Sequence, residues 1–231
     1  MSNLKNIIVD KVTLRPSTNE HSVLTSQFIW RTEKRFVGDN LIVIADIKEP
    51  IWWNRPLTSD SLCKIEPDGL YGYNLPFLGA LAGGKDLYKT GYNLLLNKNS
   101  IPCAAHIKLD ESWTEDQKNL LSQMYYDCIY DTLIDLGVAP EDLSRPRNDI
   151  LYKGKKFVGG EKAFIDDVYT EDIVITLQVL PEKEIFARLT GQYAHKRQIT
   201  GIADEVPSIT KDAFMNKLYE HLQEYVKKHL N

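Results

Sequence analysis

The sequence has 231 residues, enough for one large domain, and its 43% hydrophobic and 26% charged residues are ordinary for a globular protein. A chain of this size buries about 70% of its unfolded surface, so it needs neither disulfides nor a metal for stability. The formal net charge of −4 favours neither a nucleic-acid nor an anionic-membrane partner. We expect a single domain over residues 1–231, and a cytoplasmic location because no signal peptide or long apolar run is recognisable.

The cysteines and histidines do not form a recognisable metal or redox motif. Cys63, Cys103 and Cys128 are widely spaced, and the absence of a CxxC pair argues against a zinc ribbon or a thioredoxin-type site. The five histidines never fall at HxxH or HExxH spacing, so a metal site built from histidines has little support.

In the N-terminal third, three segments have the composition of strands. They are Asn6–Leu14, which we expect at a sheet edge, Gln27–Arg31 and Leu41–Ile47. The following stretch, Glu49–Gly79, is rich in proline and shows no period. Loops of this length are often functional, so a substrate gate and a plain surface excursion are both open interpretations.

The clearest predicted helix runs from Trp113 to Leu136, where apolar residues recur at helical spacing. Before it, Tyr92–Leu96 and Pro102–Leu109 have the composition of two adjacent strands, and after it Gly137 stands where a C-terminal cap belongs. The N-terminal capping box consists either of Ser112 with Glu115 or of Thr114 with Gln117.

The second half of the chain predicts more strands and a final helix. A tight hairpin is expected at Lys153-Gly154, a buried or central strand at Ile173–Val179, and a helix from Thr210, its N-cap, to His229. The order strands, helix, strands, helix predicts an α+β fold with a mixed β-sheet flanked by helices, rather than a doubly wound parallel sheet.

The string GALAGGKD at Gly79–Asp86 nearly matches a phosphate-binding P-loop. That motif requires a buried strand before it, a helix after it, and Ser or Thr after the lysine. None of these three features is present; the residue after Lys85, for example, is Asp86. A structural turn is the favoured interpretation. The alternative is a wall of a substrate site, because Gly83 and Gly84 allow the backbone to approach a ligand closely.

A second candidate site begins at Asn148 and Asp149, at the start of a strand that returns through the tight hairpin to Lys155 and Lys156. Neighbouring strand residues face opposite sides, so one of the two lysines points inward. An inward lysine beside Asp149 suits an anionic ligand such as a phosphate, with a metal ion bridging to the carboxylate. An exposed basic hairpin with an ordinary salt bridge is the alternative.

These strings resemble motifs of the lipoate-protein ligase A family, which belongs to the biotin/lipoate ligase superfamily. RNDI at Arg147–Ile150 and GKKFVG at Gly154–Gly159 match the family pattern in order and spacing, and AGGK with LYKTGYN, at residues 82–93, echoes its substrate-loop motif. The resemblance covers about residues 80–230. It implies a fold of the class II aminoacyl-tRNA synthetase/biotin synthetase type, here without an accessory C-terminal domain.

The resemblance implies an ATP-dependent ligase that converts lipoate or octanoate to an acyl-adenylate and transfers the acyl group to a lysine of a carrier domain. It places the catalytic cation at Lys156 and the nucleotide and Mg²⁺ at Asn148 and Asp149. The residues that it assigns to the acyl substrate are Gly83, Gly84, Tyr88 and Asn93. The implied partner is a lipoyl carrier domain, and an accessory protein is a second candidate partner. Neither nucleic acid nor membrane is expected.

The sequence also departs from the family pattern. Leu78-Gly79-Ala80-Leu81 stand where the family has paired arginines, and Tyr88-Lys89-Thr90 stand where it has Tyr-His-Asp. The alternative is therefore a diverged, non-catalytic member of the fold that binds a small molecule or a protein. A related branch transfers octanoyl groups through a cysteine. That route is disfavoured because no cysteine lies in residues 148–160, and Cys128 is expected in the core.

Overall fold

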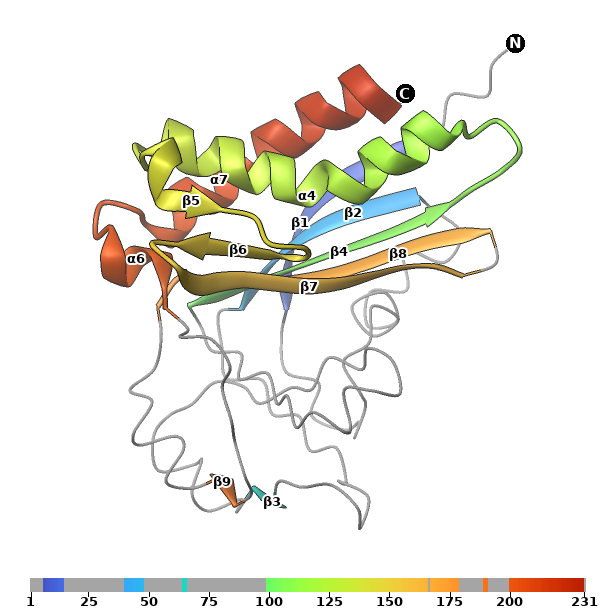
Figure 1. The fold of residues 1–231 in the computed structure, drawn as a ribbon. Coiled ribbons are helices and arrows are strands. Elements are labelled where there is room, and N and C mark those ends of the chain that lie inside the picture. Colours follow the sequence, from blue (N-terminus) through green and yellow to red (C-terminus); the bar gives the residue numbers. More distant parts are fainter. Residues whose placement is uncertain are drawn as a thin grey trace.

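The computed structural model describes residues 6–14, 40–47, 64–65, 99–165, 167–178, 189–190 and 200–230. Its centre is a seven-stranded sheet of order β1-β2-β4-β8-β7-β6-β5 (Figure 1). The strands are β1 (Ile7–Leu14), β2 (Asn40–Ile47), β4 (Ser100–Lys108), β5 (Leu143–Ser144), β6 (Asp149–Tyr152), β7 (Lys155–Ile165) and β8 (Val168–Thr176). The β1–β2 pair is parallel and every other neighbouring pair is antiparallel, so the sheet is mixed.

Two long helices cover one face of this sheet (Figure 1). They are α4 (Glu115–Asp135) and α7 (Lys211–Tyr225), and α7 continues as a π-helical turn, η3 (Val226–Leu230). Shorter elements are η2 (Pro140–Asp142), α6 (Ile202–Glu205) and the antiparallel pair of β3 (Lys64–Ile65) and β9 (Leu189–Thr190). Within the described ranges, no helix combines the length and apolar character needed to cross a membrane.

Local sequence signals fix both ends of α4. At the N-terminus the capping box is the second of the two alternatives, since Thr114 Oγ1 accepts from the Gln117 N–H and Gln117 Oε1 accepts from the Thr114 N–H, both at 3.2 Å. At the C-terminus Gly137 has a φ of +88°. Its N–H donates to Ile134 O, and the N–H of the next residue donates to Leu133 O, both at 2.9 Å. This pairing is a Schellman motif.

The core lies between the sheet and these two helices. From the sheet it takes alternate residues, which are Ile42, Ile44, Ile101, Cys103, Ala105, Ile107, Tyr169, Ile173 and Ile175. From the helices it takes apolar stripes that include Met124, Tyr125, Cys128, Ile129, Phe214, Leu218 and Leu222. Other residues of β2 and β4, such as Val43 and Ala104, are buried outside this cluster, and their alternate positions place them on the face away from the helices.

Most predicted elements within the described ranges are confirmed. β1 is an edge strand, β2 and β4 match their predicted segments, β8 lies at the centre of the sheet, and Thr210 caps α7 by accepting from the Ala213 N–H at 3.2 Å. The sheet is mixed and the described long helices pack on it, as the α+β prediction requires. The predicted strands Gln27–Arg31 and Tyr92–Leu96 lie outside the described residues.

Two strand boundaries and one prediction of irregular structure were wrong. β8 begins at Val168, five residues before the predicted Ile173, because Glu171 and its polar neighbours interrupt the apolar run although Glu171 is only 1% exposed. From the sequence we expected the strand after the hairpin turn to span only Lys155–Val158, but β7 continues to Ile165, because Gly159-Gly160 and two charged residues hide its pattern. Within the segment predicted to be irregular, residues 64–65 form the short strand β3.

Candidate active site

The candidate site is built on the hairpin of β6 and β7. Lys153 and Gly154 form its two-residue turn, with φ values of +47° and +81°, as expected for a type I′ connection. Two residues later the pairing is irregular, because Ile150 pairs with Val158 whereas Leu151 pairs with Lys156. Phe157 is the extra residue of a β-bulge.

The bulge decides which way Lys156 faces. In a regular strand, residues 156 and 159 would face opposite sides of the sheet. Here Lys156 pairs with Leu151, and Gly159 pairs with Asp149. Asp149 and Leu151 are alternate residues of one strand, so all four residues share a face. The intervening Ile150 belongs to the core beneath the helices, which places Lys156, Gly159 and Asp149 on the face that points away from α4 and α7.

Lys156 and Asp149 form an ion pair across this face. The distance from Lys156 Nζ to Asp149 Oδ1 is 2.7 Å, and the two side chains are 35% and 18% exposed. The lysine lies directly over Gly159, where an added Cβ would stand 2.5 Å from both Cε and Nζ of Lys156. Glycine is thus the residue that leaves room for the ammonium group to reach Asp149.

Asn148 belongs to a tight turn that leads into β6. The turn is closed by a 3.2 Å hydrogen bond from the Asp149 N–H to Pro146 O, and Arg147 has a φ of +58°. The carbonyl of Asn148 accepts from Tyr126 Oη at 3.0 Å. Tyr126 lies on α4 and is 1% exposed, and its burial raises the pKa of the phenol. A buried helix residue therefore anchors the turn that carries Asn148 and Asp149.

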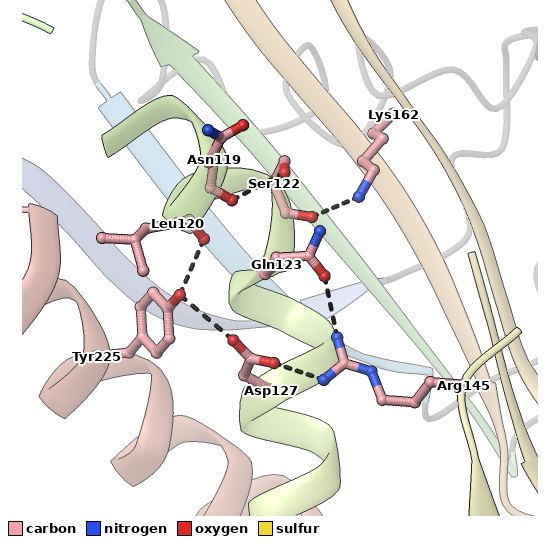
Figure 2. Close-up of polar contacts among 8 residues, drawn as sticks. All are labelled: Asn119, Leu120, Ser122, Gln123, Asp127, Arg145, Lys162 and Tyr225. Carbon is pink, nitrogen blue, oxygen red and sulfur yellow. Dashed lines mark hydrogen bonds and ion pairs between the residues drawn. The ribbon is translucent and has the colours of Figure 1, made fainter. Parts of the chain in front are cut away.

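Further polar contacts fix the hairpin and its approach to α4 (Figure 2). Arg145 Nη1 lies 2.5 Å from Asp127 Oδ1, and Nη2 donates to Gln123 Oε1 at 3.1 Å. From β7, Lys162 Nζ donates to the carbonyl of Ser122. Both cations also lie over the ring of Tyr126, at 5.7 and 5.3 Å from its centroid. These contacts attach β7 and the segment before β6 to the helix that bears Tyr126.

The structure brings two of the predicted site residues, Asp149 and Lys156, into contact, and Asn148 directly precedes Asp149 in the turn that leads into β6. The predicted substrate residues, which are Gly83, Gly84, Tyr88 and Asn93, lie outside the described residues. The whole string at residues 79–86 lies outside them as well. Lys155, the other lysine of the hairpin, is 40% exposed and forms an ion pair with Glu205 at 2.6 Å.

Sequence reasoning gave no role to Gly159 or to the hydroxyl of Tyr126. Gly159 lay within the quoted GKKFVG string, which was the available signal. Tyr126 lies within the predicted helix, and no sequence signal connects it with Asn148. An open groove, lined by residues that include Lys108, Trp113 and Phe164, lies near the other end of β7 and does not contain Lys156 or Asp149.

Among the described residues, only part of a magnesium site is present around Asp149. The part of the chain that the structure describes holds no group of three His, Cys, Asp or Glu residues that could bind a metal. Asp149 could supply one carboxylate, although its Oδ1 already contacts Lys156. Mg²⁺ often binds through one or two carboxylates together with substrate phosphates. An ion at Asp149 therefore fits only if a nucleotide brings the remaining ligands.

Cys103 and Cys128 are expected to resist alkylation in the folded protein. Each is 1% exposed, and burial raises the pKa of both thiols, with further contributions from Glu171 at Cys103 and from Asp127 and Asp131 at Cys128. Iodoacetamide at pH 8 should label both only after unfolding in urea. Peptide mass spectrometry of native and unfolded samples measures this, and rapid native labelling of either thiol would contradict the burial.

The fold of this chain is similar to those of solved lipoate-protein ligases and of a biotin protein ligase. One similar structure is LipL1 of P. falciparum, in complex with lipoate, at 11% identity and a TM-score of 0.61. That match covers 98% of this chain and 64% of that protein, so the chain spans less than two thirds of its length.

Two other structures resemble the chain over most of both lengths. The bipartite lipoate protein ligase of Thermoplasma acidophilum, described with its E2 lipoyl domain, is 12% identical at a TM-score of 0.60, covering 94% of this chain and 83% of that one. A lipoate-protein ligase A bound with ATP is 14% identical at a TM-score of 0.59, covering 96% and 85%. No protein-family model and no curated protein matches the sequence. At these identities the likeness establishes the fold.

Proposed function

We propose that this chain is an ATP-dependent acyl-protein ligase that activates lipoate or octanoate as the acyl-adenylate and transfers the acyl group to a lysine of a carrier domain. The observation that carries the proposal is the Lys156–Asp149 pair over Gly159, on the face of the sheet that points away from the long helices. The likeness in fold to lipoate-protein ligases, one of them bound with ATP, supports it.

In the first step, a carboxylate oxygen of the acid attacks the α-phosphorus of ATP, and the bond from that phosphorus to the departing pyrophosphate breaks. Negative charge grows on the α-phosphate oxygens as this happens. The ammonium group of Lys156 is held in place before the reaction by Asp149 at 2.7 Å. A preorganised cation aimed at developing charge lowers the barrier without having to reorganise during the reaction.

In the second step, the neutral amine of the carrier lysine attacks the acyl carbonyl, AMP leaves with the electrons of the mixed anhydride bond, and the nitrogen releases one proton to solvent. Lys156 would donate a hydrogen bond to the carbonyl oxygen or to the departing phosphate. Both groups carry more negative charge in the transition state than before it, so one positioned ammonium can serve both steps.

Asp149 has two roles in this proposal. It orients Lys156, and its carboxylate would hold Mg²⁺ together with the phosphates of ATP. When bound, Mg²⁺ neutralises the triphosphate and polarises its oxygens. Asn148 would contact the nucleotide from the turn fixed by Tyr126. For the acyl group we propose Gly83, Gly84, Tyr88 and Asn93, on the sequence resemblance alone.

The likeness to the Thermoplasma ligase also bears on partners. That enzyme is bipartite and was described with an E2 lipoyl domain. By analogy, we propose a lipoyl carrier domain as the acyl acceptor of this chain, and an accessory protein as a second partner that completes the activity. The experiment below should therefore be run with and without such a subunit.

The deciding experiment measures ATP–pyrophosphate exchange with lipoate, octanoate and biotin in parallel. Exchange that depends on lipoate or octanoate supports the proposed first step. The intact mass of a lipoyl carrier domain, after incubation with the same mixtures, measures the second. If no acid supports exchange, with or without the accessory subunit, the ligase proposal fails. The alternative would then be a non-catalytic binding protein, which the changed residues at Leu78–Leu81 favour.

A further inference from the structure

At the start of β7, a segment distant in sequence takes the place of a neighbouring strand. The ladder between β7 and β8 begins only at Val158, so the backbone around the bulge lacks a β8 partner among the described residues. Instead, the carbonyl of Lys156 accepts a 2.8 Å hydrogen bond from the N–H of Thr200. The chain just before α6 thereby holds the backbone of Lys156.

Thr200 is itself held by Glu205, at the end of α6. Thr200 Oγ1 donates to Glu205 Oε1 at 2.8 Å, and the same oxygen accepts from Lys155 Nζ at 2.6 Å. These hydrogen bonds lower the pKa of the Glu205 carboxyl below its usual value, with Lys155 as the largest cause. At neutral pH the Glu205 carboxylate is thus charged. It connects Lys155, the residue before Lys156, with Thr200, whose N–H binds the Lys156 carbonyl.

The segment that carries Thr200 and Glu205 is packed closely against the end of β8. A Cβ on Gly201 would clash with the backbone of Leu177 and Gln178, which shows that the chain passes close to the end of β8. The next residue, Ile202, is fully buried, and the N–H of Ala203 donates to Leu177 O at 2.8 Å. Thr200 and Glu205 therefore extend from a segment that is packed into the core, beside the hairpin end of β6 and β7 (Figure 1).

We propose that Glu205 is a positioning residue for Lys156, acting through Lys155 and Thr200. Its carboxylate binds the side chains of Lys155 and Thr200, and the N–H of Thr200 binds the carbonyl of Lys156. This ring of contacts fixes the backbone at the bulge and thereby the direction of the Lys156 side chain. On this proposal, the segment of α6 determines the geometry of a side chain that it does not itself contact. The inference rests on the proposed ligase function only for its effect on catalysis.

The test compares Glu205→Gln and Glu205→Ala with Glu224→Gln, which removes one exposed carboxylate from α7. For Glu205→Ala we expect kcat of acid-dependent pyrophosphate exchange to fall about tenfold, since small misplacements of a catalytic group are costly. The KM of the acid should stay within about twofold because the residues proposed for the acyl group are unchanged in this variant. Glu205→Gln keeps an acceptor oxygen and should lose less. Glu224→Gln should match the wild type.

A double-mutant cycle separates positioning from general destabilisation. Lys155→Met and Glu205→Ala remove the same ion pair, so the double variant should be no less active than Glu205→Ala alone. Each rate is divided by the folded fraction, measured by near-ultraviolet circular dichroism under assay conditions. Losses that multiply in the double variant, or that vanish after this correction, would overturn the proposal.

Amide hydrogen exchange at Thr200, measured by NMR, tests the ring of contacts without any catalysis. The N–H of Thr200 should exchange at least about tenfold faster in Glu205→Ala than in wild type, because its bond to Lys156 opens more often. If the wild type shows no ligase activity but this exchange responds, the proposed function fails and the structural role of Glu205 stands. If Thr200 exchange and kcat are both unchanged, Glu205 does not position Lys156.

Discussion

Replacement of Lys156 by alanine is expected to lower acid-dependent ATP–pyrophosphate exchange by about 100- to 1000-fold. This corresponds to about 3 to 4 kcal/mol, the usual cost of losing one preorganised donor to developing charge. The loss should appear in kcat, because the ammonium group would interact most strongly with the charge that grows in the transition state. The measurement is initial exchange rates at saturating ATP, with the acid that supports the highest wild-type rate.

Lys153→Ala is the matched control for this variant. Lys153 lies in the same hairpin and pairs with Asp142 at 3.3 Å, but its side chain is 56% exposed and makes no contact with Asp149 among the ion pairs of the described residues. Its loss should change the rate less than about twofold, as is usual for a surface ion pair. A Lys156→Ala enzyme with near wild-type exchange would remove Lys156 from the mechanism. Equal losses in both variants would point to the hairpin as a whole.

Gly159→Ala is expected to reduce the exchange rate by about 100-fold while the protein stays folded. The added Cβ would stand 2.5 Å from Cε and Nζ of Lys156 and 3.4 Å from Asp149 Oδ1. The flexible end of the lysine can swing away to relieve the overlap, but it then leaves Asp149 and the position proposed for the phosphate. A misplacement of about 1 Å can cost two orders of magnitude in rate.

Two measurements isolate the effect of this methyl group. The free energy of unfolding in urea should change by less than about 1.5 kcal/mol, because a side chain rather than backbone gives way. The double variant Gly159→Ala/Lys156→Ala should be no slower than Lys156→Ala, since both changes remove the same contact. A further loss in the double variant would mean that Gly159 acts through something other than Lys156.

How much the sequence predicts depends on how local the determining signal is. The capping box, the Schellman glycine at residue 137 and the turn at Lys153-Gly154 each depend on residues within a few positions. The glycine and the turn are found as predicted, and the capping box is the Thr114 one of its two predicted alternatives. The extents of β7 and β8 were missed, since Glu171 is a charged residue in a buried strand position and only the packed neighbours make that position buried.

The candidate site was likewise predicted only where the signal was local in the sequence. Motif spacing selected Asn148, Asp149 and Lys156, but the assumption of simple alternation could not show that Lys156 shares a face with Gly159. That outcome requires the bulge at Phe157. Likewise, Tyr126 and Glu205 act on the hairpin from 22 and 50 residues away in the sequence. Contacts of this separation leave no periodic trace in one sequence.

By itself, then, the sequence determined the helix ends, the hairpin and the choice of lysine as the candidate cation, because neighbouring residues alone set these. Only the tertiary structure decided where that lysine points. Strand register, the bulge and the contacts of Thr200 with Lys156 arise when distant segments pack together, and the direction of a side chain follows from that packing.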